Sequence, residues 1–199
     1  MHGLRRACPP CGGQAGWAPS RTHGAQAREP EPNIATQTTY PSYGYRQSLG
    51  WTGLGEYWES TSRTRNHEMF GSIGRWMFED LAGIQATAPG YKEIAIKPLV
   101  APGQGIDSAS ATYESVNGKI ASSWSQSSSR ITLKVTIPAN TTAKVYVPVT
   151  NPAAVQESGS GKTYAAAKAP GVKLTGTQGD AVVYTVGSGT YTFTASLSR

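Results

Sequence analysis

The sequence predicts an α+β protein in which a helical segment precedes an antiparallel β-sandwich. Apolar side chains recur at helical spacing up to about residue 81, and after Pro89 the pattern changes to the alternation of half-buried strands. The chain has 23 glycines and 13 prolines and is only 15% charged, a composition typical of a loop-rich, β-rich protein and not of a helix bundle. We therefore expect three regions, at residues 1–35, 36–88 and 89–199.

Residues 1–35 are expected to form a disordered leader. They are rich in Gly, Pro, Ala and Arg and show no periodic apolar pattern, so they cannot bury enough apolar surface to offset their ordering entropy. The stretch from Leu4 to Cys11 lacks the apolar core of a secretory signal. The abrupt change in character near residue 34 suggests that the natural reading frame, or a longer parent chain, is cut there.

Neither metal nor cofactor binding is expected. The two cysteines form a single Cys-Pro-Pro-Cys motif, Cys8 to Cys11, whereas structural zinc needs four ligands. His2 and His23 could complete such a site, but two exposed thiols on a disordered arm are the favoured interpretation. No nucleotide, phosphate or metal motif is present.

The charge pattern argues against two classes of partner. The formal net charge of +6 is scattered along the chain, with no block of five or more basic residues, which disfavours both nucleic acid and an anionic membrane surface. No apolar run has the length of a membrane span. The sequence does not indicate a cellular compartment.

Residues 36–88 hold most of the side chains of chemical interest. Helical spacing predicts one helix over Ser48–Glu59, with Trp51 and Trp58 on one face although three glycines weaken it. A second helix, about His67–Leu81, has an apolar face broader than a solvent-exposed helix needs. Because such faces normally contact further helices, we expect the isolated chain to self-associate, and we expect deletion of residues 1–88 to improve its solubility.

Alternating apolar residues predict the strands of the sandwich. Asn117-Gly118 is the signal of a type I′ hairpin turn, and several short strands separated by Gly, Pro and Asn turns favour a sandwich. The expected strands lie around Ile94 and Ile96 and at residues 109–116, 119–125, 130–137, 142–149, 172–175, 181–186 and 189–196. The aromatic side chains of this region are expected to lie mostly in its core, including Tyr113 and Trp124.

Three motifs in order carry a family resemblance. They are Tyr-Pro-Ser-Tyr-Gly-Tyr at 40–45, Gly-x-Thr-x-Leu-x-Glu-x-Trp at 50–58 and Asn-His-x-Met-Phe-Gly-Ser-Ile-Gly at 66–74. The chain resembles the C-terminal part of bacterial α-L-rhamnosidases, the inverting glycoside hydrolases of family 78, over about residues 36–196. The resemblance implies that residues 40–84 are the last helices of an α/α-barrel catalytic domain and that residues 90–196 are its C-terminal β-sandwich.

The resemblance also implies roles for three residues. Glu56 matches the general base, His67 a sugar-binding histidine and Trp58 an aromatic residue of the site wall. The chain departs from the family at Gly55, where an aromatic residue is usual, and in its shorter connection from Glu56 to His67. The family's general acid belongs to an earlier part of the barrel that this sequence lacks.

Two functions from different classes follow. In one, the chain is a fragment of an enzyme that hydrolyses terminal α-L-rhamnose from rhamnose-containing glycosides, is inactive alone and has the rest of the barrel as its partner. In the other, it is an accessory or carbohydrate-binding β-sandwich without catalysis. Without the resemblance, Glu56 would be interpreted as a surface carboxylate, His67 as a polar residue of a first helical turn and the tryptophans as core.

Overall fold

The computed structural model describes residues 31–59, 61, 64–100 and 105–197. Most of the expected leader, with both cysteines, His2 and His23, lies outside these residues. Residues 31–35, which were expected to be disordered, instead belong to a helix, α1 (Glu31–Thr36). Six residues that include a proline near the start make a short helix, and the alternation of charge and proline in the sequence concealed it.

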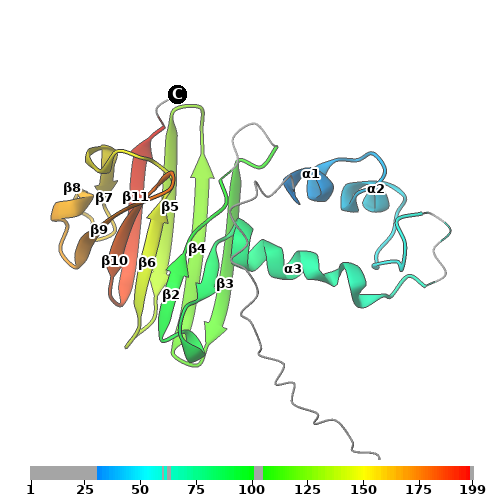
Figure 1. Cartoon of the computed structure of the whole chain (residues 1–199), viewed down its shortest axis with the longest axis horizontal. Coiled ribbons are helices and arrows are strands. Elements are labelled where there is room, and N and C mark those ends of the chain that lie inside the picture. The colour runs from blue at the N-terminus through cyan, green and yellow to red at the C-terminus, as the bar shows by residue number, and fades with distance from the viewer. Residues whose placement is uncertain (1–30, 60, 62–63, 101–104, 198–199) are drawn as a thin grey trace, which may run out of the picture.

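Two short helices and one longer helical run form the first part of the chain, beside the sheets (Figure 1). The short helices are α1 and α2 (Tyr43–Ser48); the run consists of η1 (Glu68–Gly71), α3 (Ser72–Trp76) and η2 (Met77–Leu81), a turn of π-helix. The run confirms the second expected helix within one residue of each end. Ser42 caps α2, because its hydroxyl accepts a hydrogen bond of 2.9 Å from the amide of Tyr45.

The helix expected over Ser48–Glu59 is wrong. The chain leaves helical geometry after Ser48, and Gly50 adopts a left-handed conformation with φ of 74°. Beyond it, residues 54–56 pair their backbone with residues 64–67 instead of forming helical bonds. The three glycines that weakened the helix in the sequence are therefore signals of an irregular loop.

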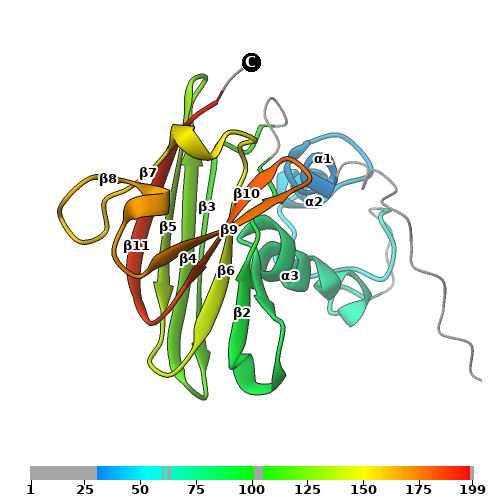
Figure 2. The ribbon, with the colours of Figure 1, turned by 60° about the vertical axis from the view of Figure 1, so that its left-hand side comes forward.

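Eleven strands in the described residues form two sheets that face each other (Figure 2). One has the order β1-β2-β6-β10-β9 and the other β3-β4-β5-β11-β7-β8. Neighbouring strands are antiparallel except β2 and β6, which are parallel. The strands are β1 (Ile84–Ala86), β2 (Glu93–Ile96), β3 (Ser108–Ser115), β4 (Gly118–Gln126), β5 (Arg130–Ile137), β6 (Thr142–Val147), β7 (Val155–Glu157), β8 (Tyr164–Ala165), β9 (Val172–Gln178), β10 (Ala181–Val186) and β11 (Gly189–Ser196).

The predicted α+β class, with helices followed by a sandwich, is confirmed. The β3–β4 hairpin also forms, but its turn differs from the expectation. Ser115 pairs with Gly118, so Val116 and Asn117 make the loop, and only Gly118 has a positive φ, of 113°. A type I′ turn needs positive φ at both central residues, and the β-branched Val116 disfavours that conformation.

Side chains from both sheets fill the core. The alternate residues of β5 illustrate the pattern, with Ile131, Leu133 and Val135 fully buried. Trp124 and Tyr184 are the largest buried side chains, and the ring of Tyr184 stacks on that of Phe193 at 5.3 Å between centroids. The expectation that most aromatic residues of this region are core holds for these, whereas Tyr113 remains 39% exposed.

The sandwich caps the end of the helical run. The last carbonyls of a helix have no partner within the helix, and here the sandwich supplies one for each of four consecutive residues. The amides of Leu99 and Lys97 donate to the carbonyls of Asp80 and Gly83, both at 2.8 Å. Ser122 and Trp124 of β4 donate to the carbonyls of Ala82 and Leu81, which fixes the direction in which the helices leave the sandwich.

Candidate functional site

A loop between α2 and η1 carries the expected site residues. Its two arms are joined by backbone hydrogen bonds, from the amide of Glu56 to the carbonyl of Thr64 (3.1 Å) and from the amide of His67 to the carbonyl of Leu54 (2.7 Å). A Cβ atom on Gly53 would lie 2.1 Å from the carbonyl oxygen of Arg65, so only glycine permits this approach. The pairing brings the backbones of Glu56 and His67 onto neighbouring arms.

Glu56 and His67 are both half-buried. Glu56 interacts with the next side chain, since its hydrogen bond and its charge raise the pKa of the exposed Tyr57.

Trp58 belongs to an aromatic cluster, which we define as Tyr43, Trp58 and Phe70. The ring of Trp58 lies 4.4 Å from that of Phe70 and meets that of Tyr43 edge to face at 5.2 Å. The hydroxyl of Tyr43 donates a 2.7 Å hydrogen bond to the carbonyl of Phe70. The cluster therefore connects α2, the loop and η1 into one unit.

Arg46, on α2, is the residue of this region that the sequence did not single out. It is 3% exposed, and its Nη1 donates to the carbonyl of Gly55 at 3.2 Å. The guanidinium carbon lies 4.7 to 5.2 Å from the ring centroids of Trp51, Trp58 and Phe70. An arginine inside a tryptophan-rich segment was the only available signal for this stacking.

The environment of Arg46 is costly for a cation. Its Nε and Nη2 have no hydrogen-bond partner within the described part of the chain, and desolvation lowers its pKa, only partly offset by Tyr43 and Glu59. Contacts between a guanidinium and aromatic faces compensate part of the lost hydration. Arg46 thus holds the residues on both sides of Glu56, because it binds Gly55 and stacks on Trp58.

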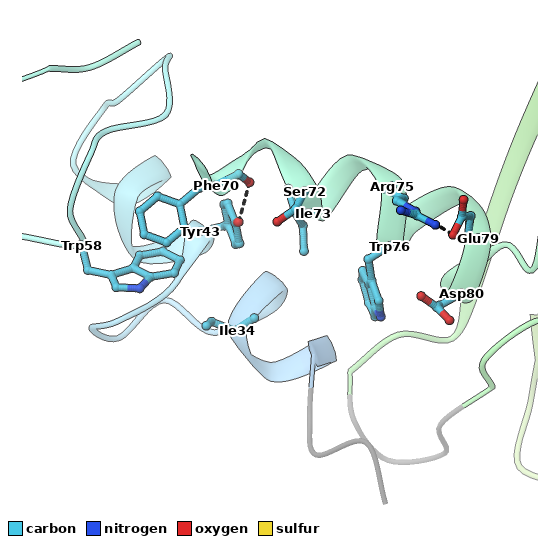
Figure 3. Close-up of a pocket in the computed structure, with 10 residues that line it drawn as sticks. All are labelled: Ile34, Tyr43, Trp58, Phe70, Ser72, Ile73, Arg75, Trp76, Glu79 and Asp80. Atoms are coloured by element: carbon cyan, nitrogen blue, oxygen red, sulfur yellow. Dashed lines mark hydrogen bonds and ion pairs between the residues drawn. The ribbon is translucent and has the colours of Figure 1, made fainter. Parts of the chain in front are cut away.

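A cleft of about 700 Å³ lies between α1, α2 and the α3–η2 helix (Figure 3). The aromatic cluster forms one end, and Trp76 and Asp80 point into the space between α3 and α1 at the other. Of the three expected site residues, Trp58 lines this cleft; Glu56 and His67 are not among its lining residues. Glu79 also borders the cleft and pairs with Arg75 at 2.8 Å.

The described residues contain no group of three or more His, Cys, Asp or Glu side chains arranged to hold a metal ion. No helix among them is long and apolar enough to cross a membrane.

Two family models match consecutive parts of the chain. Residues 25–81 match the bacterial alpha-L-rhamnosidase six-hairpin glycosidase domain, and residues 83–162 match the bacterial alpha-L-rhamnosidase C-terminal domain. The first match covers the helical segment with the candidate site. The second covers the sandwich from the end of the helical run to the loop after β7.

Individual proteins with similar sequences are also alpha-L-rhamnosidases. An alpha-L-rhamnosidase of Streptomyces avermitilis is 33% identical over 168 residues, 79% of this chain and 15% of that protein. One of Formosa agariphila is 38% identical over 123 residues, 57% of this chain and 13% of that protein. The chain therefore spans about one seventh of the length of these relatives.

Solved structures share the fold. The crystal structure of the Streptomyces avermitilis alpha-L-rhamnosidase complexed with L-rhamnose matches with a TM-score of 0.69 at 31% identity, over 82% of this chain and 16% of that one. The structure of an alpha-L-rhamnosidase from Dictyoglumus thermophilum matches with a TM-score of 0.67 at 27% identity, over 82% of this chain and 18% of that one.

Proposed function

Because the chain belongs to the bacterial α-L-rhamnosidase family, as the end of the six-hairpin glycosidase domain followed by the C-terminal domain, we propose that it supplies one wall and the general base of a site that hydrolyses terminal α-L-rhamnose by inversion. The substrates are rhamnose-containing glycosides. The observation that carries the proposal is the paired loop, which holds Glu56 beside the arm of His67 and next to the cluster of Trp58.

Inversion needs two carboxyl groups on opposite faces of the sugar. One protonates the leaving oxygen, and the other, roughly 6.5 to 9.5 Å away, removes a proton from the attacking water. Glu56 takes the second role. The general acid comes from a part of the barrel that this chain does not span, since the chain corresponds to only 15% of its Streptomyces relative.

In this proposal, His67 and Trp58 bind the sugar and orient it. His67 donates or accepts a hydrogen bond at a sugar hydroxyl or at the attacking water. Trp58 offers an apolar ring to a sugar face, and its contact with Phe70 fixes the ring plane. Arg46 holds Trp58 and the backbone before Glu56 in place, through its contact with the indole ring and its hydrogen bond to Gly55.

The partner in this proposal is the remainder of the catalytic barrel. Several large apolar side chains of the helical segment are exposed, with Tyr57 at 50%, Met77 at 44% and Phe78 and Leu49 at 43%. Such exposure within one segment is typical of a surface that another protein segment covers. The chain alone is accordingly expected to have no hydrolytic activity.

A chimera tests the proposal. Residues 31–199 would replace the matching C-terminal region of the Streptomyces avermitilis relative, and hydrolysis of an aryl α-L-rhamnoside would be measured. We expect activity with inversion at the anomeric carbon, and a loss of kcat by a factor of about 10² to 10⁴ in Glu56→Gln. Glu59→Gln, which removes a neighbouring exposed carboxylate, is the matched control and should retain activity.

Equal activity in the Glu56→Gln chimera and its parent would overturn the assignment of the base. Hydrolysis by the unfused chain that Glu56→Gln abolishes would contradict the proposed need for an acid from elsewhere in the barrel.

The alternative is an accessory β-sandwich without catalysis, either packing against the barrel or binding carbohydrate. The sandwich favours it in one respect, because its core is built from residues of the sandwich itself, from Ile84 to Ala195. An active chimera that depends on Glu56 argues against this alternative as the whole function.

A further inference from the structure

Two arginines stack on one tryptophan beside the candidate site. The guanidinium carbon of Arg46 lies 5.2 Å from the ring centroid of Trp51, and that of Arg65 lies 4.6 Å from the same centroid. Arg65 is exposed, whereas Arg46 is 3% exposed. Arg65 directly follows Thr64, whose carbonyl accepts the hydrogen bond from the amide of Glu56. The stack therefore joins α2 to both arms of the loop that carries Glu56.

Arg46 has one satisfied edge and one unsatisfied edge. Its Nη1 donates to the carbonyl of Gly55 at 3.2 Å, but its Nε and Nη2 are buried and have no hydrogen-bond partner within the described part of the chain. In a guanidinium group, Nε and Nη2 lie on the same side and donate in parallel, which matches the two oxygens of a carboxylate. The geometry of the unsatisfied edge therefore suits a carboxylate.

The carboxylate of Glu59 does not fill this edge. Its charge raises the pKa of Arg46, but the side chain of Glu59 is exposed and its Oε1 accepts a 3.1 Å hydrogen bond from the hydroxyl of Tyr40. The aromatic rings compensate part of the hydration that Arg46 loses, yet they supply no acceptor for Nε and Nη2. Because a buried cation without a bonded counter-charge is costly, we expect the acceptor to come from another part of the protein.

The burial of the edge favours a protein side chain over a diffusing anion. Because Nε and Nη2 are covered, a carboxylate has to enter while the loop is open and then stay enclosed. A side chain that packs during folding does this without the entropy cost of binding a free ligand. The chain spans only 15% of its Streptomyces relative, so most of the side chains of the barrel lie outside it.

We propose that the unsatisfied edge of Arg46 is a carboxylate-binding site, which an Asp or Glu side chain from the rest of the catalytic barrel fills. Arg65 supplies a second positive charge beside the same tryptophan and attracts the acidic partner. The bound carboxylate fixes Arg46, and through Gly55 it fixes the backbone before Glu56. This rests on the proposed function for the identity of the partner, and Arg46 acts as a positioning residue.

Formate, the smallest carboxylate, tests the site in the unfused chain. Amide hydrogen exchange over residues 51–67 would be compared in sodium formate and in sodium chloride at equal ionic strength. We expect formate to slow the exchange of this loop about fivefold at about four times its Kd, because a ligand that binds only the closed state protects it by a factor of 1 + [L]/Kd. Exchange in β5 of the sandwich should be the same in both salts.

Three variants identify the edge that binds formate. Arg46→Met has similar volume but no donors, so its loop should exchange at the same rate in formate and in chloride. Arg65→Gln, at an exposed position, should reduce the protection by formate about twofold. Arg130→Gln, which removes an exposed arginine of β5, is the matched control and should keep the full protection. Equal protection of the wild-type and Arg46→Met chains would overturn the site, as would a wild-type loop that formate does not protect.

The chimera identifies the source of the carboxylate. If the barrel supplies it, the loop in the chimera should exchange more slowly than in the unfused chain and at the same rate in both salts. A chimera that formate still protects about fivefold would overturn the barrel as the source.

The carboxylate site and the catalytic proposal fail separately. Activity that depends on Glu56 in the chimera, with no formate protection of the unfused chain, rejects the carboxylate site alone. Formate protection that requires Arg46, with no Glu56-dependent activity in the chimera, rejects the catalytic proposal alone.

Discussion

The indole nitrogen of Trp124 donates a 2.8 Å hydrogen bond to the carbonyl of Leu81. Trp124 is 1% exposed in the centre of the sandwich, and Leu81 is the last residue of the helical run. One side chain therefore fills the core of the sandwich and caps the helix that borders the cleft. Ser122, two residues earlier on β4, does the same for the carbonyl of Ala82 at 2.7 Å.

Trp124→Phe should destabilise this junction. The substitution removes the donor, leaves the carbonyl of Leu81 without a partner and opens a void in the core, which together should lower the free energy of unfolding by about 2–4 kcal/mol. Urea denaturation measures the change. Tyr113→Phe on the neighbouring strand is the control, and an unchanged midpoint for Trp124→Phe would contradict the prediction.

We predict that two substitutions of Arg46 destabilise the loop to different extents. Lysine keeps the charge but cannot bond the carbonyl of Gly55 and lie flat against three rings at once. Arg46→Lys therefore leaves a buried charge poorly paired and should loosen the loop strongly, by about 3 kcal/mol. Arg46→Met removes the charge, fills similar volume and contacts aromatic rings favourably, so it should cost less.

Amide hydrogen exchange over residues 51–67 measures that ranking. Exchange should be fastest in Arg46→Lys, intermediate in Arg46→Met and slowest in the wild-type chain. A lysine variant protected as well as the wild type would show that the stacking contributes nothing to the loop.

The strands were predictable because their signal is local. Alternation from Arg130 to Ile137 follows from the burial of one face of β5, and the observed ends of β5, β10 and β11 agree with the sequence pattern. Strands β1, β7 and β8 have two or three residues, too few for a period to show. Their place in the sheets depends on partners distant in the sequence.

The candidate site was predictable only in part. Trp58 was expected at a site wall and does line a cleft, whereas the helical spacing of Trp51 and Trp58 pointed to a helix that does not form. The bonds that replace it, from Glu56 to Thr64 and from His67 to Leu54, join residues eight or more positions apart. Arg46 could not be assigned from sequence because its burial depends on three rings, at positions 51, 58 and 70, that are spread along the chain.

We expect Tyr184 to make the stability of the fold decrease at alkaline pH. Its side chain is fully buried, its hydroxyl has no hydrogen-bond partner in the described part of the chain, and burial raises the pKa to about 12 from 10.0. The unfolded chain therefore loses this proton first as the pH rises. The contribution of the neutral Tyr184 phenol to the free energy of unfolding is complete below pH 10. It falls by roughly 2–3 kcal/mol between about pH 10 and 12.

Tyr184→Phe removes both the unpartnered buried hydroxyl and its titration. At pH 8 it should raise the free energy of unfolding by about 1 kcal/mol, since an unsatisfied buried hydroxyl is replaced by hydrogen. Between pH 10 and 12 its stability should fall less steeply than that of the wild type in urea titrations. Tyr146→Phe, at a half-buried position of β6, controls for the loss of a phenol; parallel curves for Tyr184→Phe and the wild type would contradict the assignment.

The final prediction concerns where the sandwich can be separated from the helical segment. Deletion of residues 1–88 was expected to improve solubility by removing the apolar helix faces, but it also removes β1. That strand pairs with β2, with Ile84 opposite Ile96, and Ile84 is 2% exposed. A chain that starts at Glu93 or just before it would expose β2 as an edge, and exposed edge strands promote association.

We therefore expect the order of solubility to depend on β1. A chain of residues 82–199 keeps β1 and the bond from Ser122 to Ala82, and it should be monomeric and more soluble than the full chain. A chain of residues 89–199 should unfold at a lower temperature and self-associate, because it loses the burial of Ile84, worth about 2–3 kcal/mol, together with the pairing to β2. Size-exclusion chromatography and thermal denaturation compare the two. If the shorter chain matched the longer in both, β1 would be dispensable and the helical faces alone would determine association.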